Sequence, residues 1–135
     1  MVDFNSVMAA DNFRLARSKN LVSLADGTYN IIQLPRYSFV RDVWLYISTA
    51  YAGGDGVATV GFTGNGETAD DDAFINGFWA DATATGLKKM TAGYGAWSSG
   101  KWFNTASGQI TISLDDQAAT TLMIGVVFVE YTVIH

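Results

Sequence analysis

The stretch from Val40 to Thr63 constrains the fold more than any other part of the chain. Residues 43–49 alternate between two sets of positions, which is the period of a β-strand. Both sets are largely apolar, so we expect this strand to be covered on both sides, inside a sandwich or at a subunit interface. The glycine-rich segment 52–56 predicts a turn, and residues 57–63 alternate again. The sequence therefore predicts a β-hairpin over 40–63 at the centre of a sheet.

The rest of the chain contains shorter strand patterns separated by turn residues. Strands are expected at 21–24, 28–34, 101–103, 109–114 and 121–134. The last of these is apolar on both faces, so we place it beside the central hairpin, with Glu130 at an edge or a subunit contact. Between the strands we expect a polar loop at 64–72 and a long packed loop at 82–100. Residues 73–81 fit either a strand or a short helix.

About eight strands with almost no helical pattern predict an all-β fold in one domain over residues 1–135. Their number and spacing favour a two-sheet sandwich of jelly-roll type, and the alternative is a closed β-barrel. Residues 1–20 lack a clear pattern and are expected to form a short N-terminal arm. No apolar run reaches the length of a membrane span, so no membrane partner is expected.

Charge is scarce and unevenly distributed. Charged residues make up 16% of the chain, below the usual share of about 25%, which indicates that partners cover part of the surface. Residues 1–41 carry five cationic and three acidic side chains, whereas residues 42–135 carry three and ten. The net charge of −5 argues against nucleic acid as a partner. The basic front and acidic body suit contacts with an acidic surface or between copies, and Arg14, Arg17 and Lys19 are the candidate contact residues.

Few residues could carry catalysis. The chain has no cysteine, and its one histidine, His135, is the last residue. These facts exclude the commonest acyl-transfer triads and nearly all zinc and iron sites, so we predict no enzyme activity and no cofactor. Carboxylate chemistry remains: paired carboxylates leave a glycosidase as a disfavoured alternative, and clustered carboxylates could form a calcium site or simply a solvated acidic loop. The candidate calcium ligands are Asp70, Asp71, Asp72 and Asp81.

Aromatic residues near the middle of the chain allow a second kind of site. Trp97 and Trp102 could form a platform on which a sugar stacks, as in a carbohydrate-binding module. The same residues could instead anchor a loop in the core or at an interface.

Four sequence blocks together resemble small all-β virion proteins of tailed bacteriophages. They are DVWLYISTAY with VATVGFTGNGETADDDAFI, and the closing GQITISLDD and TTLMIGVVFVEYTVI. The resemblance covers roughly residues 28–134 and is to decoration (cement) proteins, with tail or fibre components as the alternative. It implies a structural protein on the capsid surface of the virion, an oligomer (most often a trimer), the major capsid protein as partner, and no catalytic residues.

Overall fold

The computed structural model describes residues 13–22, 24–52, 56–76, 85–90, 97, 99–115 and 121–134. Expectations that concern Asp81, His135, the middle of the 52–56 turn and most of the N-terminal arm lie outside these residues. The strands are β1 (Arg14–Arg17), β2 (Leu21–Val22), β3 (Gly27–Leu34), β4 (Ser38–Thr49), β5 (Val57–Gly64), β6 (Glu67–Ile75), β7 (Gly86–Lys89), β8 (Lys101–Phe103), β9 (Gly108–Asp115) and β10 (Ile124–Val133).

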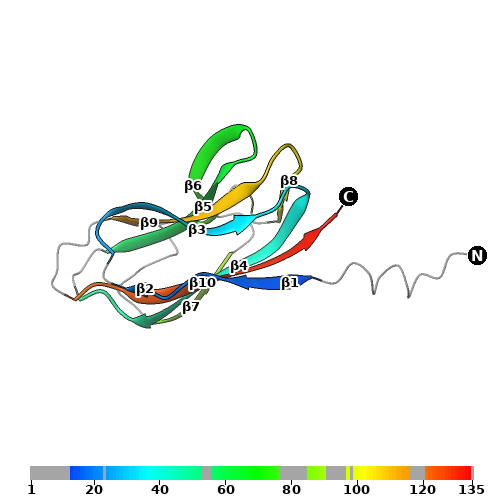
Figure 1. Ribbon diagram of the computed structural model, residues 1–135. Helices are drawn as coiled ribbons and strands as arrows, with labels where there is room; N and C mark the ends of the chain where they lie inside the picture. The colour runs from blue at the N-terminus through cyan, green and yellow to red at the C-terminus, as the bar shows by residue number, and fades with distance from the viewer. Residues whose placement is uncertain are drawn as a thin grey trace, which may run out of the picture.

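These strands form two antiparallel sheets packed face to face, seen as two layers in Figure 1. The six-stranded sheet has the order β1-β10-β4-β7, with β2 also paired to β10 and β8 also paired to β4. The four-stranded sheet has the order β3-β9-β5-β6. The predicted all-β sandwich is therefore confirmed, and the described strands form no closed barrel.

The ten strands occupy eight positions in the two sheets. Because β1 and β2 both pair with β10, they fill one position, and β7 and β8 fill another beside β4. The chain crosses between the sheets repeatedly, which is the connectivity of a jelly roll. Among the described residues no helix is long and apolar enough to cross a membrane.

The predicted hairpin over 40–63 is wrong, although both of its strands exist. β4 pairs with β10, β7 and β8, whereas β5 lies in the other sheet between β9 and β6. Alternation identifies a strand but not its partner, and the segment between β4 and β5 crosses from one sheet to the other. Tyr51 is buried in this crossing and packs on Gly56, where an added Cβ would lie 2.3 Å from the ring.

The hairpin that does form lies one strand later, between β5 and β6. Its turn places Gly64, Asn65 and Gly66 at φ values of 95°, 60° and 70°, a backbone conformation that glycine and asparagine adopt most readily. Residues 67–72 are therefore strand and not the predicted polar loop. Likewise, the predicted packed loop at 82–100 contains β7, which pairs with β4.

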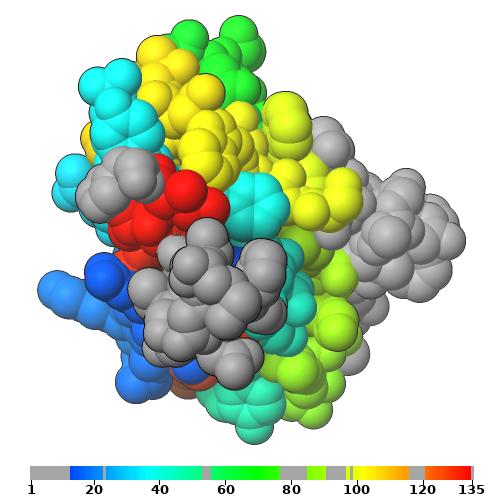
Figure 2. Space-filling model, turned by 90° about the vertical axis from the view of Figure 1, so that its right-hand side faces the viewer, coloured from blue at the N-terminus to red at the C-terminus, as the bar shows by residue number. Residues whose placement is uncertain are grey.

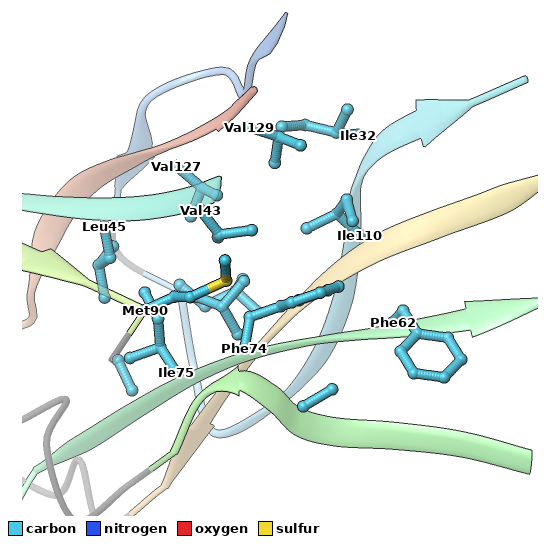
Figure 3. Packing of buried hydrophobic residues seen from close by; sticks show 14 of the residues in the cluster. Ile32, Val43, Leu45, Phe62, Phe74, Ile75, Met90, Ile110, Val127 and Val129 are labelled. Atoms are coloured by element: carbon cyan, nitrogen blue, oxygen red, sulfur yellow. The ribbon is translucent and has the colours of Figure 1, made fainter. Parts of the chain in front are cut away.

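The core lies between the two sheets. Figure 3 shows Val43, Leu45, Val127 and Val129 of the six-stranded sheet facing Ile32, Ile110 and Phe74 of the four-stranded sheet. The predicted strand at 109–114 is confirmed as part of β9. The prediction that residues 121–134 lie beside the central strand is also confirmed, since β10 pairs with β4 over most of its length.

Candidate interaction surface

The side of the six-stranded sheet that faces away from the core is unusually apolar. On β4, Val43 and Leu45 are fully buried, so Trp44 and Tyr46 at the alternate positions point the other way. The same alternation applies on the neighbouring strands. We call the part of this side that spans β1, β2, β10, β7 and residues 44–46 of β4 the outer sheet face, and its apolar members are Leu15, Val22, Trp44, Tyr46, Leu87, Ile124, Val126 and Phe128.

Strand register arranges these side chains in rows across the sheet. Trp44 is directly opposite Phe128 on β10 and Lys89 on β7, and Phe128 is opposite Arg17 on β1. One row therefore runs cation, aromatic, aromatic, cation. The next row joins Val126, Tyr46 and Leu87. Side chains at directly opposite positions of paired strands lie close enough to interact, so the rows form one continuous surface.

Much of the outer sheet face is exposed, although Val126 within it is buried. Six large apolar side chains of the described residues are exposed, and four of them lie here: Leu15 at 64%, Leu87 at 59%, Val22 at 49% and Tyr46 at 44%. An open hollow in the face is lined by Phe13, Arg14, Leu15, Trp44, Leu87, Phe128 and Glu130. In Figure 2 the blue side chains of β1 and the yellow-green side chains of β7 lie on opposite sides of the lower half. Contiguous apolar surface of this kind marks a site of interaction.

The cationic residues predicted for contact lie along one margin of this face. Arg14 lines the hollow, and the Arg17 guanidinium lies 6.0 Å from the Phe128 ring and donates a hydrogen bond to Asn20 Oδ1 at 2.8 Å. Lys19 is exposed just after β1. Residues 14–17 are paired with β10 as an edge strand, so this part of the expected arm is docked in the sheet.

Glu130 lies within the sheet and not at its edge, because β10 is flanked by β1 and β4. Its carboxylate forms an ion pair with Arg41, and the Arg41 guanidinium in turn lies 3.9 Å from the Phe13 ring. The expectation of an edge position is therefore wrong. Glu130 instead contributes a carboxylate, already paired with a cation, to the margin of the hollow.

The acidic candidates come from β6. The carboxylates of Asp70, Asp71 and Asp72 lie within 4.8 Å of one another. In a regular strand Asp71 would point away from its neighbours, but pairing irregularities between β5 and β6 bend this stretch. A hydrogen bond with Asp70, followed by burial and the charges of its neighbours, raises the pKa of Asp72. Acidic side chains often gather without an ion, so calcium binding stays a prediction.

The two candidate sugar-stacking residues pack against different aromatic side chains, and sugar binding stays a prediction. Trp102 packs against Phe39, with the ring centres 6.1 Å apart. Trp97 packs against Phe62, with the ring centres 6.4 Å apart, and its backbone amide donates to Ala73 O. Each indole is thus engaged with a different part of the fold.

Sequence reasoning missed a buried polar cluster beneath Trp97. Lys101 is 3% exposed, and its Nζ lies 2.5 Å from Glu67 Oε2 and near the rings of three aromatic residues. The hydrogen bond from Lys101, with a smaller contribution from Asn65, lowers the pKa of Glu67 against the opposing effect of burial. The available signal was the alternation of β8, which puts Lys101 on the same inward side as Phe103.

Comparison with known proteins identifies the fold. No family model matches the chain, and no curated protein matches it. Three solved capsid structures contain a similar chain. That in the capsid of Ralstonia phage GP4 has a TM-score of 0.68 and 12% identity, and the match covers 92% of this chain and 86% of that one.

The other two similar chains match over a comparable length. The chain in the cyanophage Pam1 capsid has a TM-score of 0.65 and 17% identity, with 92% and 86% covered. The chain in the acidic stable capsid of Helicobacter pylori bacteriophage KHP30 has a TM-score of 0.64 and 19% identity, with 90% and 87% covered. This protein has the fold of chains in phage capsids. The resemblance drawn from the sequence is thus confirmed at the level of the fold.

Proposed function

We propose that this protein is a structural component of a phage virion that binds the outside of the capsid and stabilises the shell by bridging its subunits. The observation that carries the proposal is the similarity, over about nine-tenths of the chain, to chains in three phage capsids. Fold alone does not define function, so the proposal also depends on a surface suited to the task.

The outer sheet face supplies that surface. Its exposed apolar side chains would lose contact with water against a shell, and apolar burial contributes about 25 cal/mol per Å² before the costs of association are subtracted. Trp44 and Phe128 stand at its centre, and aromatic residues are enriched among those that dominate binding energy. This face is thus the part of the molecule that we assign to the major capsid protein.

The cationic side chains at the margin of the outer sheet face would orient the protein on the shell. Arg14, Arg17 and Lys19 offer cationic groups beside the apolar surface, and a carboxylate on the capsid protein would form charge-assisted hydrogen bonds with them. Such rim charges act mainly on association rate and specificity. We therefore expect an acidic patch on the shell opposite β1.

Bridging would raise the barrier to rupture of the shell. A protein bound across a joint must lose contact with one subunit before the joint opens. Many copies acting on one particle add their effects, even where each contact is weak. The trimer implied by the sequence resemblance would strengthen this effect by giving each unit three attachment points.

Two experiments test the proposal. Purified protein is mixed with capsids that lack it, and bound protein is measured by co-sedimentation; the proposal expects saturable binding and a higher temperature of shell rupture. Immunogold labelling of virions is expected to mark the capsid. Label confined to the tail would overturn the capsid assignment in favour of a tail component, and absence of saturable binding would overturn the bridging function.

A further inference from the structure

The buried cluster around Lys101 brings an amine and an amide together on one carboxylate. Lys101 Nζ and Asn65 Nδ2 each lie 2.5 Å from Glu67 Oε2. The two nitrogens are therefore no farther apart than twice that distance. Lys101 is 3% exposed and Asn65 4% exposed, so both are nearly inaccessible to solvent.

The amide of Asn65 is polarised in the direction that favours nucleophilic attack on its carbon. Asn65 Oδ1 accepts hydrogen bonds from the backbone amides of Thr105, at 2.8 Å, and Ala106, at 3.0 Å. Two backbone donors on one carbonyl oxygen form the arrangement that stabilises an oxyanion in acyl transfer. On the nitrogen side of the same amide stands Glu67, where it can deliver a proton to a departing amine.

Lys101 is held for such an attack with its amine shielded from water, whereas the Glu67 side chain is 36% exposed. Its Nζ lies 4.2 Å from the centre of the Trp97 ring, 4.7 Å from that of Phe62 and 5.5 Å from that of Phe103. These rings leave Glu67 as the acceptor within reach for the lysine proton. Moving that proton to the carboxylate leaves an uncharged amine among the aromatic rings, where a buried ammonium is costly to desolvate.

We propose that Lys101 and Asn65 become joined by an isopeptide bond, with Glu67 carrying the protons. Glu67 first accepts a proton from the Lys101 ammonium, and the freed electron pair on Nζ attacks Cγ of Asn65. The negative charge that develops on Oδ1 is held by the amides of Thr105 and Ala106. The Cγ–Nδ2 bond then breaks, and the carbonyl re-forms.

Protons and atoms balance without any other reactant. Lys101 Nζ loses two of its three protons, Glu67 passes both to Asn65 Nδ2, and the amide nitrogen leaves as ammonium. Glu67 returns to its ionised form. The reaction occurs once per chain, since its product is part of the protein.

The bond would connect the two sheets covalently. Asn65 lies in the turn between β5 and β6 of the four-stranded sheet, and Lys101 lies on β8 of the six-stranded sheet. A chain without cysteine has no disulfide with which to make such a link. This inference does not depend on the proposed capsid function, because the chemistry lies within one chain.

Intact-mass spectrometry of the purified wild-type protein tests the proposal. The expected mass is lower than that of the sequence by one ammonia, about 17 Da. Trypsin does not cleave after an acylated lysine, so residues 42–88 and 90–135 are expected as one branched product joined through Asn65 and Lys101. A wild-type protein at full mass, with no branched product, would overturn the proposal.

Three matched variants test which residues form the isopeptide bond and whether Glu67 carries the protons. Lys101→Arg keeps a cation but cannot form the bond, and is expected at full mass. Lys89→Arg makes the same change on β7 and is expected to lose ammonia like the wild type. Glu67→Gln, with its fold checked by circular dichroism, is expected at full mass. Loss of ammonia in folded Glu67→Gln would contradict the role given to Glu67, and its loss in Lys101→Arg would place the bond elsewhere.

Discussion

Trp44 and Phe128 stand directly opposite each other on β4 and β10, on the side of the six-stranded sheet away from the core. An indole and a phenyl ring at such a position cover a large apolar area with little conformational freedom to lose. The cations Arg17 and Lys89 continue the same row on either side. This arrangement matches the general form of an interface, an apolar centre with a charged rim.

Replacing the central indole should weaken attachment to the shell. We expect Trp44→Ala to raise the dissociation constant for bare capsids at least about tenfold, since aromatic anchors dominate interface energy. Co-sedimentation isotherms measure this, with circular dichroism confirming that the variant is folded. Trp97→Ala is the control, because that indole packs against Phe62 on β5 of the four-stranded sheet. Equal loss of binding in both variants would contradict the assignment of the outer sheet face.

The basic margin should govern the salt dependence of binding. Arg14→Gln, Arg17→Gln and Lys19→Gln combined are expected to slow association and to flatten its dependence on ionic strength, since rim charges act by steering. Surface plasmon resonance on immobilised capsids measures both quantities. Arg36→Gln, an exposed cation in the connection between β3 and β4, should leave the salt dependence unchanged. An unchanged slope in the triple variant would exclude these residues from the contact.

Much of the fold follows from residue patterns, because alternation reports which residues share a face. Alternation predicts residues 43–49 and 121–134 as strands covered on both sides, and they do lie side by side as β4 and β10. Alternation carries no information on pairing, however. A glycine-rich turn after β4 is compatible with a hairpin and equally with a crossing to the other sheet, and packing of Tyr51 on Gly56 accompanies the crossing.

The candidate site was less accessible to sequence reasoning. Arg14 and Arg17 were identified from charge alone, but the outer sheet face combines side chains from β1, β2, β4, β7 and β10. It emerges only when register is known. The surroundings of Lys101 could not be predicted from the sequence either. One lysine in a three-residue strand gives no sign of the aromatic rings and the carboxylate that surround it.

The acidic cluster on β6 should make stability depend on pH. The pKa of Asp72 is raised in the folded state, so the folded protein binds more protons than the unfolded chain once the pH exceeds 3.8, the ordinary pKa of an aspartate. Stability from this group therefore falls as the pH rises through the raised pKa, and the penalty persists at neutral pH. Asp72→Asn should remove it and raise the melting temperature at pH 7 but not at pH 3. The gain should stay under about 1 kcal/mol, because the side chain is exposed.

Thermal melts of Asp72→Asn at the two pH values make this comparison. Asp26→Asn changes net charge equally in the connection between β2 and β3 and controls for it. A gain at pH 3 as large as that at pH 7 would contradict the pKa argument.

Melts of the wild type with added calcium test the predicted calcium site: a rise in melting temperature that Asp72→Asn abolishes is expected if these carboxylates bind the ion.

Gly61 is required where the backbone of β6 lies against β5. A Cβ at this position would lie 1.9 Å from the backbone oxygen of Asp70, and backbone cannot move aside as a flexible side chain can. We expect Gly61→Ala to destabilise the fold by about 3 kcal/mol. Urea denaturation measures this, with Thr59→Ala on the same strand as the control. A loss no larger than that of Thr59→Ala would show that the two strands can separate without cost.

The central claim is that the outer sheet face attaches this protein to a phage shell. Its most direct test is the co-sedimentation isotherm of Leu87→Arg on bare capsids, compared with Gln33→Arg, which places the same charge at an exposed position on β3 of the other sheet. The account predicts saturable binding by the wild type and Gln33→Arg and loss of binding by Leu87→Arg. Binding by Leu87→Arg equal to that of the wild type would contradict it.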